Sequence, residues 1–262
     1  MLSKSEIINA PHFKQLLAEA EAAAFTGWDF QWLENRMIQQ DPPWDYPALV
    51  QKKILQVTSL LDMGTDDGEL LASLGPLPQD SHATEAYSPN QSLAVDRLAN
   101  LGVKVHPIED DSRLPFPAER FELVINRHES YDPLEVWRIL KPNGMFITQQ
   151  VSGLDNLELN QVLEDHPSLP FINWGLPNAA EELSRANFSI ERVDQAALQT
   201  IFKDVGAVVY YLKAIPWQVE GFSIETHLDK LAILHNTIER NGYLMTTAHR
   251  FLIVARKKEV SP

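Results

Sequence analysis

Short apolar runs alternate with amphipathic stretches through the middle of the chain. Five short runs have the pattern of buried strands: 59–63, 82–87, 103–108, 121–127 and 145–151. Three stretches between them space their apolar residues as helices do: 69–74, 90–102 and 133–140. Asn90 is positioned to cap the second of these helices. Strands that alternate with helices at this rhythm predict a parallel sheet with helices on both faces. The expected fold class is therefore α/β, a doubly wound and mostly parallel sheet.

The segment before this core has a different pattern. From Pro11 to Phe25 the apolar residues recur at helical spacing, which predicts an amphipathic helix. The next stretch is unusually aromatic and surrounds two adjacent prolines. These aromatic residues are Trp28, Phe30, Trp32, Trp44 and Tyr46. Two interpretations stay open, an N-terminal arm that packs on the core and a lid over a substrate or cofactor.

Beyond residue 151 the regular alternation loosens. We expect a strand over 189–195, a helix that ends at Gly242 and a last strand over 249–258. The resulting division is a helical, aromatic N-terminal arm over residues 1–50 and one domain over 51–262. Cap insertions are expected in that domain at about 152–187 and 198–246.

Composition narrows the possible partners. Lys and Arg number 22 against 36 Asp and Glu, a formal net charge of −14, which disfavours nucleic acid as a partner. The absence of cysteine excludes disulfides, thiolate zinc sites and a cysteine nucleophile. No stretch reads as a signal peptide or membrane span, so a cytoplasmic location is expected. His227 and His235 lie eight residues apart, unlike a zinc pair at i, i+4, and no metal site is expected.

The stretch SLLDMGTDDGELLASL, residues 59–74, holds the candidate chemistry. An apolar strand leads into a turn with Gly64 and Gly68 and then into a helix, the usual place of a ligand crevice in an open parallel sheet. Asp66 stands where the dinucleotide fingerprint has its second glycine, which weakens a nicotinamide or flavin interpretation. Asp62, Asp66 and Asp67 together would repel a pyrophosphate and attract a cationic ligand.

Residues 60–151 resemble the core of class I S-adenosylmethionine-dependent methyltransferases. The first motif of that family, roughly D-x-G-x-G-x-G, stands here as Asp62, Gly64, Asp66 and Gly68, with a departure at Asp66. The segment EDDSRLPF is similar to the third motif, and LKPNGMFI is similar to the turn before the fifth strand. The resemblance implies a Rossmann-like, seven-stranded methyltransferase fold. It also implies S-adenosyl-L-methionine as cofactor and S-adenosyl-L-homocysteine as product.

The resemblance also implies which residues surround the cofactor. Glu85, 23 residues after Asp62, corresponds to the acid that binds the ribose hydroxyls, and Tyr87 either covers the adenine ring or packs on the next helix. Asp110 or Asp111 falls at the adenine edge, with Ser112 nearby. The implied cofactor-binding set is Asp62, Gly64, Thr65, Asp66, Gly68, Glu85, Ala86, Tyr87, Asp110, Asp111, Ser112 and Asn126.

Two of these positions leave alternatives open. Asp66 either caps the following helix while tolerating an unusual backbone angle, contacts the methionine amino group, or marks a relative that has lost the cofactor. After the fourth strand, INRHESY places Asn126, Arg127, His128 and Glu129 between cofactor and acceptor. His128 is the candidate general base, with a hydrogen-bonding role as the alternative.

The sequence therefore predicts methyl transfer to an unidentified small-molecule acceptor by a monomer or homodimer. Four aromatic residues form either an acceptor pocket or core: Trp174, Tyr210, Tyr211 and Trp217. One alternative function is an RNA methyltransferase of the ribosomal-RNA type, because VVYYLKAIPW is faintly similar to a segment of those enzymes. Another is a non-catalytic methyltransferase fold that serves as a binding module.

Overall fold

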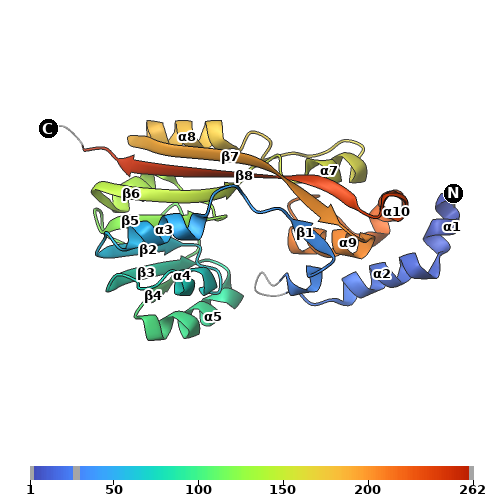
Figure 1. The fold of residues 1–262 in the computed structure, drawn as a ribbon, viewed down its shortest axis with the longest axis horizontal. Coiled ribbons are helices and arrows are strands. Elements are labelled where there is room, and N and C mark those ends of the chain that lie inside the picture. The colour runs from blue at the N-terminus through green and yellow to red at the C-terminus, as the bar shows by residue number, and fades with distance from the viewer. Residues whose placement is uncertain (1–2, 26–29, 260–262) are drawn as a thin grey trace. The chain divides into compact units, whose positions relative to one another are not determined.

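A computed structural model describes residues 3–25 and 30–259, so Trp28 of the predicted arm lies outside the described residues. The chain divides into two compact units (Figure 1). Unit 1 comprises residues 1–41, 153–172 and 197–249, and unit 2 comprises residues 42–152, 173–196 and 250–262. The boundaries expected from the sequence, at residues 50 and 51, stay a prediction.

Unit 2 contains the parallel strands that the sequence predicts. They are β2 (Ser59–Met63), β3 (Asp80–Glu85), β4 (Lys104–Pro107), β5 (Phe121–Arg127) and β6 (Leu140–Val151). Strand β2 pairs in parallel with both β3 and β5, β3 pairs with β4, and β5 pairs with β6. Nearly every residue of β2 and β5 is buried, because helices cover both faces of the sheet.

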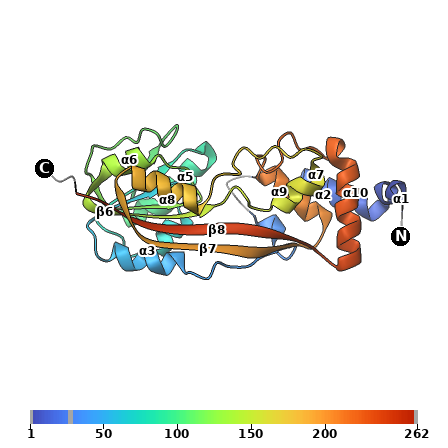
Figure 2. The same ribbon diagram turned by 90° about the horizontal axis from the view of Figure 1, so that it is seen from above.

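Five helices of unit 2 form the two outer layers. They are α3 (Tyr46–Ile54), α4 (Glu69–Ser73), α5 (Ser88–Leu98), α6 (Pro133–Ile139) and α8 (Leu176–Arg185). Apolar side chains of α3, α4 and α5 form one core cluster with the sheet, and those of α6 and α8 form another. Figure 2 shows α3 and α8 on opposite sides of the strands. The predicted doubly wound α/β class is therefore confirmed.

The sheet differs from the prediction in strand number. Within the described residues it has eight strands in the order β1-β7-β8-β6-β5-β2-β3-β4, where seven were expected. The additional one is the short β1 (Met37–Gln39), which pairs antiparallel with β7 (Phe188–Phe202). Three residues with one polar side chain give no strand signal by themselves, so only the partner strand reveals β1.

The last two strands are longer than predicted. Strand β7 extends from residue 188 to 202 and β8 (Leu244–Lys257) begins five residues before the expected start. Residues 250–256 of β8 pair antiparallel with β6. The added residues mix Thr, Gln and Ala with apolar positions, so their extended conformation depends on cross-strand partners. Both strands contribute residues to each unit.

Unit 1 is mainly helical. Its helices are α1 (Lys4–Asn9), α2 (Pro11–Ala22), α7 (Leu157–Leu163), α9 (Val205–Ala214) and α10 (Ile224–Asn241), with the short 3-10 helix η1 (Gln31–Leu33). They share one core cluster. No helix in residues 3–25 or 30–259 is both long enough and apolar enough to cross a membrane.

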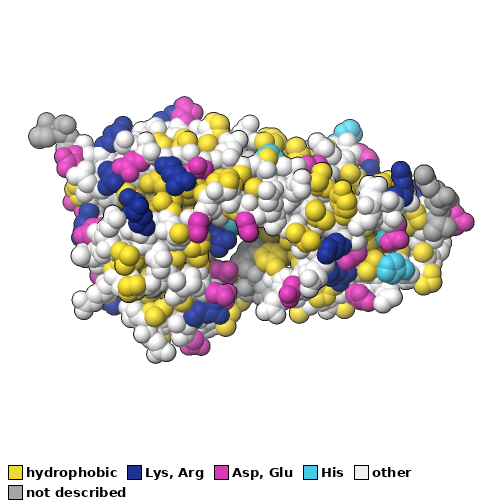
Figure 3. Space-filling view, in the orientation of Figure 1, with side chains coloured by type: hydrophobic (Ala, Val, Ile, Leu, Met, Phe, Trp, Pro, Cys, Tyr) yellow, Lys and Arg dark blue, Asp and Glu magenta, His cyan; other side chains and the backbone are white. Residues whose placement is uncertain are grey.

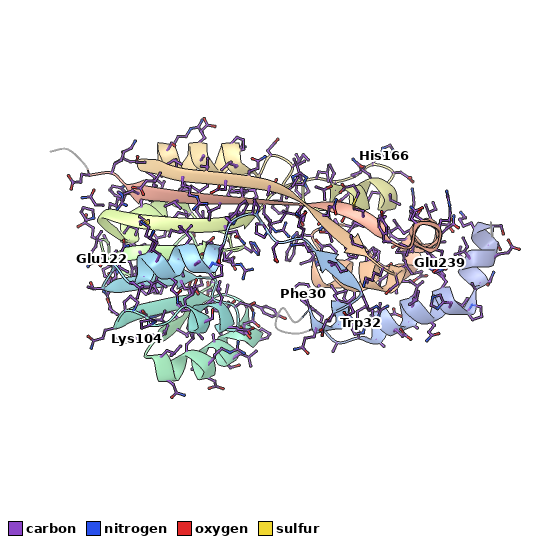
Figure 4. The ribbon with its side chains drawn as sticks, in the orientation of Figure 1. Phe30, Trp32, Lys104, Glu122, His166 and Glu239 are labelled. Carbon is purple, nitrogen blue, oxygen red and sulfur yellow. The ribbon has the colours of Figure 1, made fainter. Side chains whose placement is uncertain are left out.

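The aromatic residues of the predicted arm pack in both units. Trp32 stacks on Tyr210 of α9 at 4.7 Å between ring centroids, and the Arg36 guanidinium lies 3.8 Å from the Trp32 ring centre. Figure 4 shows Phe30 and Trp32 in the region of β1 and α9. Trp44 and Tyr46 are instead buried in unit 2. For these described side chains, core packing is what the structure shows.

A buried histidine pair on β3 and β4 predicts a pH-dependent stability. Nδ1 of His82 lies 2.8 Å from Nε2 of His106, and burial lowers the pKa of both rings. In the unfolded chain the pKa of each ring is about 6.5. At these two residues the unfolded state therefore takes up more protons as the pH falls, so the contribution of the pair to the free energy of unfolding should decrease from pH 7 to pH 5.

Urea denaturation at several pH values checks this expectation. In His106→Phe, which keeps a ring beside His82, this contribution is reduced, so the free energy of unfolding at pH 5 relative to pH 7 should be higher than in the wild type. The exposed His166→Phe is the matched control and should keep the wild-type slope. Equal slopes in all three proteins would contradict the role of the pair.

Candidate functional site

The carboxyl ends of β2 and β5 mark the point where strand order changes direction in unit 2. From β2 the chain continues to β3 and β4 on one side, whereas β5 and β6 lie on the other. Open parallel sheets bind ligands in the crevice at this switch point. The segments that follow β2, β3 and β5 therefore form the candidate site.

Backbone hydrogen bonds hold the turn after β2. The N–H of Thr65 donates to the carbonyl of Thr84 on β3, with 3.0 Å between N and O, and the N–H of Gly68 donates to the carbonyl of Thr65 at 2.9 Å. The φ angle is positive at Gly64 (+66°), Asp66 (+58°) and Gly68 (+82°). Aspartate is one of the few side chains that tolerate this region. The unusual backbone angle predicted at Asp66 is confirmed.

Gly64 leaves no room for a side chain. A Cβ at this position would lie 2.4 Å from Cγ of Glu129, which follows β5. The Oε1 atom of Glu129 accepts a hydrogen bond from the N–H of Ser130 at 2.9 Å. A carboxylate-bearing side chain therefore packs directly on the backbone of the turn, and only glycine permits that approach.

The side chain of Asp66 does not cap α4, so that interpretation is wrong. The N–H of Glu69 donates to Oδ1 of Asp67, at 2.9 Å, while Oδ1 of Asp66 accepts from Nδ2 of Asn90 at 2.5 Å. Asp66 thus connects the turn to α5. This contact joins residues 24 positions apart, which a capping rule based on local spacing does not reveal.

The predicted capping role of Asn90 is wrong for the same reason. Helix α5 begins at Ser88, two residues earlier, and its N-cap residue Tyr87 makes no side-chain capping bond. Asn90 lies inside the first turn of the helix and is fully buried. Its amide donates to Asp66, and its Oδ1 is buried with no hydrogen-bond partner among the described residues.

Glu85 is the last residue of β3 and points into the same region. It is 4% exposed, and its Oε1 accepts a hydrogen bond from the N–H of Tyr87 at 2.7 Å. Burial raises the pKa of Glu85 to about 7, against the lowering effect of the N–H groups of Tyr87 and Asp66. The nearby carboxylates of Glu129 and Asp66 also raise it. Glu85 therefore ionises only at a cost that a cationic or hydrogen-bond-donating ligand would offset.

Three further carboxyl groups of the site behave in the same way. Burial is the main cause that raises the pKa of Asp62 to about 7, and of Asp66 and Asp111 to about 6. The Arg127 guanidinium opposes the shift at Asp62 and Asp66. Arg97 is a second cation beside this group: it also lowers the pKa of Asp66, and its Nη1 lies 2.8 Å from Oδ2 of Asp67. The acids still outnumber the two cations, so the crevice should attract positive charge and repel phosphate.

Of the predicted adenine-edge residues, Asp110 and Ser112 are exposed, whereas Asp111 is half-buried. Oδ1 of Asp110 accepts hydrogen bonds from the N–H, at 2.7 Å, and the hydroxyl of Ser112, and both residues are exposed. Oδ2 of Asp111 accepts from Oγ of Ser130 at 2.6 Å. Its Oδ1 is buried and has no hydrogen-bond partner within the part of the chain that the structure describes. Buried acceptors without partners point to a donor that a ligand would supply.

Asn126, at the end of β5, uses its side chain within the protein. Its Oδ1 accepts from Oγ1 of Thr148, at 2.9 Å, and from Nε2 of Gln150, at 2.6 Å. Its Nδ2 donates to the carbonyl of Ser130 at 3.3 Å. These bonds join β5, β6 and the loop after β5, and the cofactor contact of Asn126 stays a prediction.

His128 follows β5 with a positive φ of 61°. Its N–H donates to the carbonyl of Gln149 at 2.8 Å, and its Nε2 lies 3.1 Å from Nε2 of Gln149. The residue as a whole is exposed. Desolvation of the ring by the surrounding protein, together with the charges of Arg250 and Arg127, keeps its pKa well below the usual value. His128 is therefore neutral at pH 7, and the predicted role as a base stays a prediction.

Comparison with solved structures identifies the fold of this chain. A candidate methyltransferase from Bacillus halodurans is 16% identical and covers 80% of this chain and 99% of its own, with a TM-score of 0.55. The YcgJ protein of Bacillus subtilis is 18% identical over 82% of this chain and 98% of its own, with a TM-score of 0.54. The fold is that of the class I S-adenosylmethionine-dependent methyltransferases.

A third structural neighbour shows that this fold also occurs in a protein named for a different reaction. The [4+2]-cyclase SpnF is 16% identical over 94% of this chain and 93% of its own, with a TM-score of 0.51. The sequence matches no protein-family model. A search of the curated proteins likewise finds no match. Because one fold serves several reactions, the site residues have to carry the functional argument.

The remaining predicted residues lie at the rim of the methyltransferase-fold crevice or away from it. Ala86 and Tyr87 are exposed, the tyrosine to 42%. Tyr210 and Tyr211 are buried in the core of unit 1, and Trp174 packs on Tyr131 in unit 2 with ring centroids 6.1 Å apart. For these three rings core packing is observed. No group of three or more His, Asp or Glu among the described residues is arranged to hold a metal ion.

Sequence reasoning missed three residues that shape the site. Asn90 holds Asp66, Gln149 contacts His128, and Trp44 donates through Nε1 to Oε1 of Gln149 at 2.7 Å. No local pattern marks any of them, because each acts on a residue that is distant in sequence. Pairing of β5 with β6, which places Gln149 opposite Arg127, is the information that would have found Gln149.

Proposed function

We propose that the protein transfers a methyl group from S-adenosylmethionine to a small-molecule acceptor. The observation that carries the proposal is the set of carboxyl groups at the switch point of a methyltransferase fold, of which Asp62 and Glu85 are buried and Asp66 and Asp111 are half-buried. S-adenosylmethionine carries a sulfonium and an amino group, both cationic, and its ribose and adenine offer hydrogen-bond donors. Phosphate-bearing dinucleotides would be repelled at the same place.

The residues present fit that cofactor. Gly64 leaves the turn open to close approach, and the partnerless Oδ1 atoms of Asp111 and Asn90 are acceptors for donors of the ligand. By family resemblance Glu85 would bind the ribose hydroxyls and Asp111 the adenine edge. Asp62 and Asp66 would face the cationic end. The cofactor supplies an activated methyl group when bound, so the protein mainly positions the reactants and excludes water.

A small molecule is favoured over RNA as the acceptor. The net charge of −14 opposes binding of a phosphate backbone. On the face drawn in Figure 3, Lys and Arg side chains lie among Asp and Glu side chains over each unit, without a continuous basic surface. An RNA acceptor would need such a surface for its phosphates.

The test of methyl transfer is formation of S-adenosylhomocysteine. Purified protein is incubated with S-adenosylmethionine and fractions of a bacterial small-molecule extract, with and without ribonuclease treatment. We expect at least one ribonuclease-resistant fraction to give product at a rate at least tenfold above that of Glu85→Gln. Product that disappears after ribonuclease would support RNA instead, and no product with any fraction would favour a non-catalytic binding module.

Cofactor affinity should depend on pH in a defined direction. The pKa values of Asp62 and Glu85, raised to about 7, mean that these groups are partly protonated at pH 6 and ionised at pH 8. A cationic ligand binds the ionised form, so binding should release protons and strengthen from pH 6 to pH 8, by about tenfold for each of the two groups that must ionise. Calorimetry in two buffers of different ionisation enthalpy measures the released protons. Proton uptake, or affinity that falls with pH, would contradict this electrostatic account.

A further inference from the structure

Three residues of unit 2 form a directed chain of hydrogen bonds that ends at His128. The indole Nε1–H of Trp44 lies 2.7 Å from Oε1 of Gln149, and Nε2 of Gln149 lies 3.1 Å from Nε2 of His128. Trp44 and Gln149 are 7% and 4% exposed, so water competes little for these bonds. The chain connects the segment before α3 to β6 and to the residue that follows β5.

The chemistry of the three groups fixes the direction of the chain. An indole N–H only donates, so the atom of Gln149 that faces Trp44 must be the carbonyl oxygen. The other end of the amide is then the NH₂ group, which only donates. Nε2 of His128 must therefore accept, and in a neutral imidazole the proton is left on Nδ1.

We infer that Trp44 and Gln149 hold His128 as the Nδ1–H tautomer, so that the ring offers a hydrogen-bond donor, and not a base, to the acceptor substrate. The lone pair of Nε2 is engaged by Gln149. Nδ1 has no hydrogen bond to any residue in the described ranges, and the residue is exposed. Trp44 and Gln149 are thus positioning residues that act through His128.

This assignment narrows the class of acceptor. In methyl transfer the acceptor atom supplies the electron pair of the new bond to carbon, and the sulfur keeps the pair of the broken bond. With no lone pair available on His128, the reacting atom must already carry an accessible pair near neutral pH. The acceptor should also carry an oxygen that accepts from Nδ1–H, and the charges of Arg127 and Arg250 near the ring favour an anionic oxygen. The role toward an acceptor rests on the proposed function, whereas the tautomer does not.

Long-range proton–nitrogen NMR of the unliganded, histidine-labelled protein measures the tautomer directly. The His128 signal is assigned by its absence from His128→Asn. In the wild type at pH 7.5 we expect a neutral ring with the proton on Nδ1 and a bare Nε2. A proton on Nε2 would overturn the inference, whether or not the protein binds S-adenosylmethionine.

Two variants test the cause of the tautomer. In Gln149→Glu the carboxylate can only accept, so the proton should move to Nε2 and the pKa of His128 should rise. In Trp44→Phe the Gln149 amide is free to turn, and a mixture of tautomers should result. The signals of His82 and His106, which lie elsewhere in unit 2, report that each variant is folded. A wild-type pattern in folded Gln149→Glu would overturn the role of Gln149.

Discussion

Replacing Glu85 by Gln should weaken S-adenosylmethionine binding about 10- to 100-fold. The side chain is buried at the end of β3. In the proposed function its carboxylate would accept the two ribose hydroxyls and attract the positive charge of the ligand. An amide of the same shape keeps the packing, loses the charge and offers one acceptor atom fewer. Charge-assisted hydrogen bonds contribute about 1.5–3 kcal/mol, which corresponds to this loss. Isothermal calorimetry measures the affinity at pH 8, where the wild-type group is ionised.

Glu135→Gln is the matched control for this substitution. Glu135 is also a buried carboxylate of unit 2, but it accepts from the N–H of Leu114 at 2.6 Å and from Arg138 on its own helix. Glu135→Gln should lower stability and leave the affinity of the remaining folded protein unchanged.

The Glu85→Gln variant itself should be more stable than the wild type at pH 8, because a pKa of about 7 means that ionisation of Glu85 opposes folding there. Wild-type affinity in Glu85→Gln would disprove the ribose assignment.

Gly64→Ala should damage both stability and binding. The position has a φ of +66°, and the added Cβ would lie 2.4 Å from Cγ of Glu129. A non-glycine residue in the left-handed region costs about 1–3 kcal/mol, and Glu129 must also move. We expect a loss of unfolding free energy in the upper part of that range and at least a tenfold loss of S-adenosylmethionine affinity. Urea denaturation and calorimetry measure the two effects.

Gly102→Ala separates backbone strain from the close contact. Gly102 ends the helix region after α5 with a φ of +73°, and a Cβ there would meet nothing within 4 Å. This variant should lose stability through strain alone and keep the affinity of the wild type. If both variants lost stability equally and both kept the cofactor affinity, Glu129 would not cover a functional turn.

The order of the core elements could be predicted from sequence because buried parallel strands carry their own signal. The runs at 59–63 and 121–127 are found as β2 and β5 with the expected bounds. The glycine turn also follows from local chemistry, since Asp66 is a residue that tolerates a positive φ. The rule that ligands bind at strand carboxyl ends predicts the site region from the same element order.

What the sequence did not reveal depends on contacts between distant residues. The bond from Asn90 to Asp66 replaces two predicted helix caps, and the chain from Trp44 through Gln149 sets the state of His128. The short β1 exists because β7 pairs with it. Local patterns predict which groups are present, whereas register and packing decide which of them meet.

The most direct test of the proposed function is calorimetric titration of the purified protein with S-adenosylmethionine and S-adenosylhomocysteine, with NADH as the comparison ligand. The carboxylates at the switch point predict binding of both adenosyl ligands in the micromolar range at pH 8, loss of that binding in Glu85→Gln and no heat with NADH. Binding of NADH, or silence with both adenosyl ligands from protein that is folded, would contradict the assignment of this crevice to S-adenosylmethionine.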